Sequence, residues 1–168
     1  MMLHISKSSN KSKLTKVQDI DNQPNAVDLR VDKIFTISND VFMIDEEKKV
    51  HRKTTELLPD ESGYFWLVPG TYEIVMENII SVGEGEAGWV ITRSTLNRNG
   101  VYITSGLYDS GYNGVMAGAM HVKCGPARIK RGTRVGQFLL FKSETLKMYD
   151  GDYGVNKEHD NKYGVNND

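Results

Sequence analysis

Apolar and polar residues alternate along much of this chain, which is the pattern expected of β-strands that bury one face. Between residues 24 and 37 the alternation runs from Val27 to Val31 and resumes, one position out of step, at Ile34. A single shift of this kind indicates a β-bulge, in which one extra residue bends the strand. The segment is therefore predicted to be a strand with a bulge near its middle.

Five further segments have the β-branched and aromatic residues typical of strands, and Gly or Pro turns separate several of them. These segments are residues 64–68, 71–76, 89–91, 115–122 and 135–141. Only residues 19–21 and 143–149 are compatible with a helix, and both stretches are short. Many short strands with frequent turns predict a mostly β fold of the sandwich, jelly-roll or barrel type.

Three segments differ in composition from the predicted strands. Residues 1–16 are rich in lysine and serine and are predicted to form a polar N-terminal arm, ahead of a β domain over residues 17–148. Residues 38–62 are highly charged and predict a solvated hairpin or loop. The tail, residues 149–168, is polar and contains the sequence Tyr-Gly-Val-Asn twice. Such a tail is either a disordered end or a flexible flap that becomes ordered over a ligand.

The charges of the chain nearly cancel. Its 168 residues include 21 basic and 22 acidic side chains, for a net charge of -1, so bulk electrostatics give no attraction to nucleic acid. No apolar run is long enough to cross a bilayer and the N-terminus lacks the apolar core of a secretion signal, so no membrane contact is expected. The lone cysteine, Cys124, favours a reducing compartment, and the cytoplasm is the expected location.

Residues 93–114 gather the side chains with the clearest chemical use. Arg93 is followed by two hydroxyl side chains, Ser94 and Thr95, a combination that suits a phosphate. Asp109 lies between glycines and suits activation of a water molecule, although turns also favour aspartate and glycine for conformational reasons alone. The four histidines and the single cysteine have no spacing typical of a metal site.

Five sequence stretches, in consistent order and spacing, resemble the motifs of the dUTPase and dCTP deaminase superfamily. They are PNAVDLR, RSTLNRNG, GLYDSGYNG, RGTRVGQFLLF and NKYGVN, and they span the chain from Pro24 almost to its end. The resemblance implies a dUTPase-like distorted jelly roll, or β-clip, and a homotrimer with active sites at subunit interfaces. It also implies that the flexible tail closes over the active site.

The resemblance further implies roles for individual residues. Asp109 would activate the water that attacks the α-phosphorus, and Tyr112 would pack against the deoxyribose. Mg²⁺ would be held mainly by the triphosphate, without direct protein ligands. The substrate-binding residues implied by the matching motifs are Arg93, Ser94, Thr95, Arg98, Gly106, Tyr112, Gln137, Lys162 and Tyr163.

The two activities of this superfamily require different groups. Its deaminases use a glutamate ten residues beyond the aspartate of the third motif, and that position is Ala119 here, with no acid between Val115 and His121. Because alanine transfers no proton, the resemblance favours a dUTP diphosphatase, which hydrolyses dUTP to dUMP and pyrophosphate.

The motifs also depart from those of dUTPases. Ser110 and Gly111 stand where dUTPases have an aspartate before the tyrosine, and Lys162 stands in place of an arginine in the tail. Small residues at positions 117–119 leave room near the expected base pocket. Three alternatives therefore stay open: a dCTP deaminase that uses another acid, a hydrolase of another or modified deoxypyrimidine triphosphate, and a non-catalytic nucleotide-binding homologue.

Overall fold

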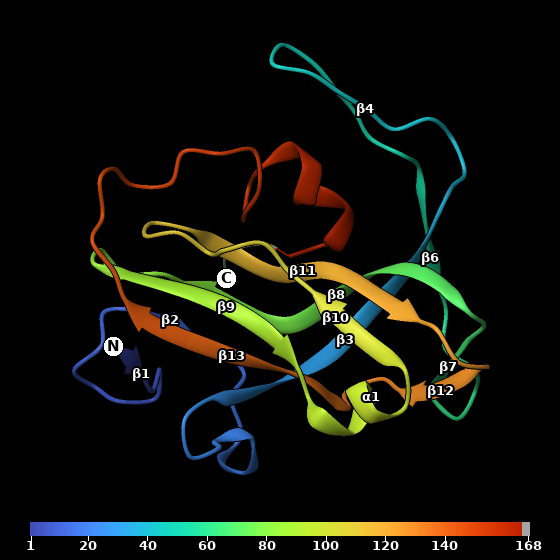
Figure 1. Ribbon diagram of the computed structural model, residues 1–168, viewed down its shortest axis with the longest axis horizontal. Helices are drawn as coiled ribbons and strands as arrows, with labels where there is room; N and C mark the ends of the chain where they lie inside the picture. The colour runs from blue at the N-terminus through green and yellow to red at the C-terminus, as the bar shows by residue number, and fades with distance from the viewer. Residues whose placement is uncertain (166–168) are drawn as a thin grey trace.

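The computed structural model describes residues 1–165 and has mostly β structure (Figure 1), as the alternation predicts. The strands are β1 (Met2–Leu3), β2 (Lys13–Leu14), β3 (Val27–Ile37), β4 (Met43–Ile44), β5 (Lys49–Val50), β6 (Thr54–Leu57), β7 (Tyr64–Leu67), β8 (Gly70–Ser81), β9 (Glu86–Thr92), β10 (Val101–Thr104), β11 (Asn113–Val122), β12 (Ala127–Lys130) and β13 (Arg134–Lys142). The helical segments are η1 (Asp19–Asp21), α1 (Ser94–Arg98) and η2 (Glu158–Tyr163).

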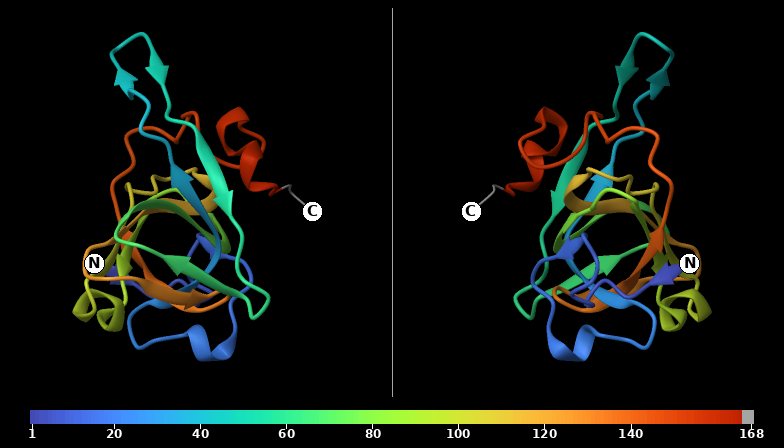
Figure 2. Two further views of the ribbon diagram at one scale, coloured as in Figure 1. Left: turned by 90° about the vertical axis from the view of Figure 1, so that its right-hand side faces the viewer. Right: turned by 90° about the vertical axis from the view of Figure 1, so that its left-hand side faces the viewer.

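Nine of the strands form one antiparallel sheet that curls around the core (Figure 2). The order across the sheet is β1-β13-β3-β8-β11-β10, with β2 paired to β8, β6 to β3 and β9 to β13. Where β9 approaches β10, the hydroxyl of Thr92 donates to the carbonyl of Ile103 and accepts the N–H of the same residue. Two small ribbons, β7 with β12 and β4 with β5, complete the described strands.

Strand β3 contains the bulge that the alternation predicts. Its pairing with β8 changes register between Val31 and Lys33. Val27, Leu29 and Val31 have no exposed surface, and they pack with apolar side chains of β8, β11 and β13. The main hydrophobic core therefore lies inside the curled sheet.

The helical segments differ in part from the expectation. Residues 19–21 form the short helix η1, but residues 143–149 contain no helix. Helices α1 and η2 were not predicted, because their 5 and 6 residues are too few to produce a repeating apolar pattern. None of the helices within residues 1–165 has the length and apolar character needed to cross a bilayer.

The N-terminal segment, for which the composition predicts a polar arm, lies against the sheet. Met2 and Leu3 pair with the end of β13, and Ile5 is buried. Ser12 is buried as well, and its hydroxyl donates to the carboxylate of Glu86, 74 residues further along the chain. Composition alone gives no indication of a partner so distant in sequence.

The charged run at residues 38–62 contains the β4–β5 hairpin, which projects from the body of the molecule (Figures 1 and 2). Its side chains are exposed, including the apolar side chains of Phe42, Met43 and Ile44. The hairpin that the charge pattern predicts is therefore present, although its exposed surface is more apolar than the pattern suggests.

The described part of the tail, residues 149–165, folds back over the outer face of the sheet (Figure 1). Tyr163 is buried there against Phe35, Val75 and Val115, which come from β3, β8 and β11. These contacts supply the apolar partners that the tail itself lacks. The remaining residues of the predicted tail, 166–168, lie outside the described residues.

The tail crosses β11 at a point where two glycines meet. A Cβ atom on Gly114 would lie 2.6 Å from the Cα atom of Gly154, a distance that real side chains do not adopt. The N–H of Val155 donates to the carbonyl of Asn113 at 2.9 Å beside this crossing. The path of the tail over the sheet is therefore fixed by backbone contact.

Candidate active site

The tail and the sheet enclose a pocket of about 520 Å³, which we call the tail pocket. Its walls come from the segment between β10 and β11, from the paired strands β8 and β11, and from the tail. It is lined by Ile37, His51, Glu73, Gly106, Leu107, Tyr108, Tyr112, Ala117, Gly118, Ala119, Tyr149, Tyr153, His159, Asp160 and Tyr163. Pockets of roughly 300–1,000 Å³ typically bind small organic ligands.

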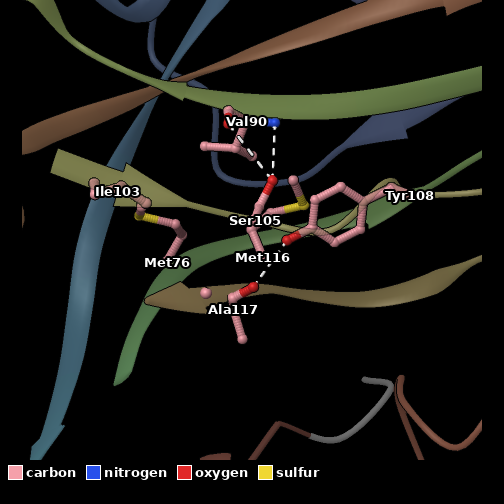
Figure 3. A pocket seen from close by; sticks show the side chains of 8 residues that line it. Met76, Val90, Ile103, Ser105, Tyr108, Met116 and Ala117 are labelled. Carbon is pink, nitrogen blue, oxygen red and sulfur yellow. Dashed lines mark hydrogen bonds between the residues drawn. The ribbon is translucent and has the colours of Figure 1, made fainter. Parts of the chain in front are cut away.

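Two tyrosines form one fixed aromatic wall of the tail pocket. The hydroxyl of Tyr108 donates to the carbonyl of Ala117 at 3.0 Å (Figure 3). The hydroxyl of Tyr112 donates to the carbonyl of Val115 at 2.7 Å, and the two ring centroids lie 5.1 Å apart. Burial raises the pKa of both phenols, so both remain protonated donors at neutral pH. Their hydroxyls are therefore used within the protein.

A second cavity, of about 10 Å³, lies inside the sheet behind Tyr108 (Figure 3). Met76, Ile103 and Met116 give it apolar walls. A space of this size holds no more than a water molecule, so it is a packing gap and not a ligand site. Beside it, the hydroxyl of Ser105 accepts the N–H of Val90 at 3.3 Å and links the end of β10 to β9.

The predicted catalytic residue, Asp109, occupies the turn between these two tyrosines. Its carbonyl accepts the N–H of Tyr112 at 3.0 Å. Gly111 supplies the φ of +90° that the turn requires, a conformation that favours glycine. The side chain of Asp109 is exposed and does not line the tail pocket. Its carboxylate is therefore available to solvent and to a neighbouring molecule.

An ion pair fastens the tail over the pocket. Nζ of Lys162 lies 2.7 Å from Oε1 of Glu73 and 2.9 Å from Oε2. The same ammonium lies 5.1 Å from the ring centroid of Tyr163. Burial, and then the negative charge of Glu73, raise the pKa of Tyr163. Both predicted tail residues are thus located at the pocket.

Histidine and aspartate side chains hold the other side of the tail over the pocket. Nδ1 of His159 lies 2.9 Å from Oδ1 of Asp160, and Oδ2 of Asp160 accepts the N–H of Gly154 at 2.7 Å. The ring of His51, beside β5, lies 4.7 Å from the ring of His159. Partial burial, and then the charge of His159, lower the pKa of His51.

A second cluster, which we call the Asp28 cluster, forms where β3 pairs with β13. The side chain of Asp28 has no exposed surface. Its Oδ2 lies 3.3 Å from Nε of Arg93 and 3.2 Å from Nη1 of Arg134, and its Oδ1 accepts a hydrogen bond from Gln137 at 3.1 Å. Two predicted substrate-binding residues, Arg93 and Gln137, are therefore held by one buried carboxylate.

The other residues of the second motif surround this cluster. Arg93 is the residue that precedes α1, and its Nη1 donates to the carbonyl of Arg134 at 3.2 Å. Ser94 and Thr95 form the exposed first turn of α1, and Arg98 is exposed in its last turn. One corner of the chain thus presents an anchored arginine next to two accessible hydroxyls and a further arginine.

The predicted site residues consequently form two separate groups in one chain. Gly106, Tyr112 and Tyr163 line the tail pocket, and Lys162 is paired at its wall. The group around the Asp28 cluster contributes no residue to that pocket. Figures 1 and 2 place α1 and η2 on opposite sides of the curled sheet.

Sequence patterns did not identify the charged residues of the tail pocket. Glu73 occupies a polar position in the alternation of β8, and this was its one signal. Asp160 and His159 lie in a polar tail without periodicity. Within residues 1–165, no cluster of three or more His, Cys, Asp or Glu side chains could hold a metal ion.

Comparison with known proteins identifies the family of this chain. The chain is 34% identical over 142 residues to a Halobacterium salinarum protein named probable deoxyuridine 5'-triphosphate nucleotidohydrolase, covering 82% of this chain and 85% of that protein. It is 31% identical over 130 residues to the deoxyuridine 5'-triphosphate nucleotidohydrolase of Methanocaldococcus jannaschii, covering 76% and 83%.

Among solved structures, the fold is similar to that of 2'-deoxycytidine 5'-triphosphate deaminase from Agrobacterium tumefaciens. The TM-score is 0.57 at 18% identity, and the match covers 77% of this chain but only 43% of that one. The sequence profile of the dCTP deaminase-like family matches residues 4–143. The resemblance seen in the motifs is thereby confirmed, and the chain belongs to the dCTP deaminase-like family.

Proposed function

We propose that this protein is a dUTP diphosphatase that hydrolyses dUTP to dUMP and pyrophosphate. The observation that carries the proposal is that the chain has two features that suit this reaction. One is an aromatic pocket that adjoins the exposed carboxylate of Asp109. The other is an arginine cluster built on Asp28. The relatives named as deoxyuridine 5'-triphosphate nucleotidohydrolases support the choice of reaction.

The protein acts as a homotrimer of dUTPase-like β-clip subunits, with each active site shared between copies. A nucleoside triphosphate must contact the base pocket and the phosphate-binding arginines at once. In one chain these groups lie on opposite sides of the sheet (Figure 2), so a second copy must supply one of them. Repeated head-to-tail contacts around a threefold axis would produce equivalent shared sites.

The reaction is displacement at the α-phosphorus. Asp109 orients a water molecule and accepts one of its protons as the water oxygen bonds to phosphorus. The bond from the α-phosphorus to the bridging oxygen breaks, and the electron pair leaves with pyrophosphate. Arg93 and Gln137 stabilise the phosphate charge, with Ser94, Thr95 and Arg98 around them. Gly106 and Tyr112 form the wall against the base and deoxyribose.

Magnesium fits this arrangement as an ion held mainly by the substrate. Mg²⁺ prefers oxygen ligands and usually retains several waters. The oxygens of Asp28 are already engaged by Arg93, Arg134 and Gln137, which leaves Asp109 as the accessible carboxylate of the proposed site. The ion would neutralise charge on the triphosphate, while the residues of the chain position the water and the nucleotide.

The tail serves as a lid. Lys162 and Tyr163 hold residues 149–165 over the tail pocket through Glu73 and the apolar patch on the sheet. Closing this lid excludes bulk water from the base and sugar, which strengthens polar contacts inside the site.

One observation favours a second candidate, deamination of dCTP. Glu73 on β8 is the direct cross-strand partner of Ala119, the position at which deaminases of the superfamily carry their acid. A carboxylate is therefore present next to that position, although it comes from another strand.

A product assay separates the two candidates. The purified protein is given dUTP, dCTP or dTTP with Mg²⁺, and pyrophosphate and ammonia are measured. We expect pyrophosphate from dUTP and no ammonia from dCTP. Asp109→Asn should abolish hydrolysis while leaving nucleotide binding intact, whereas Asp19→Asn, an exposed control on η1, should change neither. Ammonia from dCTP would instead favour deamination, and turnover unchanged by Asp109→Asn would remove this residue from the mechanism.

A further inference from the structure

Glu73 and Asp160 are the two carboxylates that line the tail pocket. Glu73 lies on β8, its side chain retains only 17% exposure, and it forms part of the pocket wall. In the pairing of β8 with β11 it stands directly opposite Ala119, a small residue that also lines the pocket. A buried carboxylate at such a position needs a partner, since an unpaired buried charge is costly.

Other polar groups of the pocket already have partners within the protein. The hydroxyls of Tyr108 and Tyr112 donate to backbone carbonyls. Asp160 accepts the N–H of Gly154 and contacts His159. These groups hold the walls and the roof together, and their hydrogen-bonding capacity is largely used. Both oxygens of Asp160 are engaged in this way, so Glu73 is the carboxylate of the pocket wall with capacity left for a ligand.

The partner is Lys162, and the pair retains unused capacity. Nζ of Lys162 contacts both carboxylate oxygens, but only the contact to Oε2 has hydrogen-bond geometry, and the buried Oε1 accepts no hydrogen bond within residues 1–165. Oε2 can accept a second hydrogen bond beside the one from Lys162. Nζ also donates to Oγ1 of Thr54 at 3.3 Å, which leaves one of the three ammonium hydrogens for a ligand. The pair thus offers an acceptor next to a donor at the wall of an aromatic pocket.

We propose that Glu73 is the residue that selects uracil, an inference that rests on the proposed function of the same site. Its carboxylate accepts the N3–H of the base, and Lys162 donates to an adjacent carbonyl oxygen. Uracil has a carbonyl oxygen on each side of its N3–H. Whichever of these oxygens faces Lys162 can therefore accept the hydrogen bond from the ammonium. Cytosine has a lone pair at N3 and repels the carboxylate there. The small side chains of Ala117 and Ala119 leave room for the base to approach.

The test measures binding and not turnover. Non-hydrolysable α,β-imido analogues of dUTP and dCTP are titrated calorimetrically, with Mg²⁺, into the assembled full-length protein. We expect the wild type to prefer the dUTP analogue at least tenfold. Glu73→Gln should weaken the dUTP analogue by about 10- to 100-fold, the usual effect of losing a hydrogen bond to a charged group, and change the dCTP analogue by less than about threefold. Glu73→Asp, which retains the carboxylate, should keep the preference for uracil.

Two results would overturn this inference. If Glu73→Gln weakened both analogues equally, Glu73 would only fasten the tail. If the wild type did not discriminate, or if the variant lost cytosine binding, the base would not be selected as proposed. Glu56→Gln is the matched control, because Glu56 pairs with Lys33 outside the pocket. Wild-type hydrolysis of dUTP, measured separately, distinguishes failure of this inference from failure of the proposed function.

Discussion

The buried carboxylate of Asp28 lies 3.3 Å from Nε of Arg93 and, together with the carbonyl of Arg134, fixes this side chain at the corner of α1. We predict that Asp28→Asn lowers the free energy of unfolding by about 2–3 kcal/mol, because two arginines lose their buried counter-charge. Affinity for the triphosphate should fall as well, because Arg93 loses its orientation. Thermal unfolding and nucleotide titration would measure the two effects.

Asp32→Asn is a matched control for this change. Asp32 also pairs with an arginine, Arg131, but both side chains are substantially exposed. Exposed pairs contribute about 0–1 kcal/mol, so this variant should remain close to the wild type in both measurements. Equal effects of the two substitutions would show that burial of Asp28 is unimportant.

The proposed trimer with shared active sites predicts complementation between inactive variants. Asp109→Asn and Arg93→Ala should each be nearly inactive alone. When they are co-expressed, random mixing in a trimer should restore activity at about a quarter of the sites, because some sites receive both intact groups. Steady-state turnover of the purified mixed trimers is the measurement. Asp109→Asn mixed with Tyr112→Ala should give no recovery, since both changes affect the same turn.

Removal of the tail should affect turnover more than assembly. Truncation after Tyr149 deletes Tyr163 and its contacts with Phe35, Val75 and Val115. We expect turnover to fall at least tenfold as the proposed lid is lost, while the mass of the proposed trimer, measured by light scattering, stays the same. The single substitution Tyr163→Ala should produce part of this effect. Parallel loss of turnover and of the trimer would assign the tail a structural role instead.

Closure of the tail should weaken in mild acid. Its neighbour His51 has a pKa below its ordinary value of 6.5, because burial and the charges of His159, Lys162 and Lys49 outweigh the opposing charge of Asp152. The open state therefore binds more protons than the closed one, and closure is lost progressively as the pH falls below about 6.5.

Hydrogen exchange of the tail amides at pH 7.5 and 5.5 would measure this effect, with faster exchange expected at the lower pH after correction for intrinsic rates. His51→Gln removes the titrating group and should flatten the dependence. A dependence unchanged in this variant would show that His51 is not the group responsible.

The N-terminal segment should detach when Glu86 loses its charge. Oε1 accepts the N–H of Lys11 at 3.0 Å and Oε2 the N–H of Ser12 at 2.8 Å. Burial opposes ionisation, but the hydrogen bonds from Ser12 and Lys11 outweigh it and lower the pKa of Glu86. Attachment is thus complete above about pH 4.5 and weakens as the pH falls through the lowered value. Glu86→Gln should weaken attachment by about 1–3 kcal/mol, detected as faster tryptic cleavage at Lys11.

Sequence patterns predicted where the strands lie better than which residues pack against one another. The alternation in β3, including its bulge, follows from residues adjacent in the chain, and so does the strand character of β8, β11 and β13. The burial of Tyr163 does not, because its three partners lie on separate strands. Short helices such as η2 likewise have too few turns to show a pattern.

In the candidate site, too, single residues were easier to predict from the sequence than the contacts between them. The motifs identified Asp109, Arg93 and Gln137 as chemical groups, and the first motif contains Asp28, but none of them indicated that the carboxylate of Asp28 joins Arg93 to Gln137. Glu73 and Lys162 are 89 residues apart, and alternation indicates only the face on which Glu73 lies. Contacts of this kind depend on how the curled sheet brings distant segments together.

The short path of the tail has a consequence for how the proposed lid depends on protein concentration. Tyr149 already lines the tail pocket, and the chain returns to it at Tyr153 and again at η2. A segment on so short a tether is present at its own pocket at an effective concentration in the millimolar range or above. A detached tail peptide would therefore have to reach about millimolar concentration to replace it, whereas the tethered lid closes equally well at any dilution of the protein.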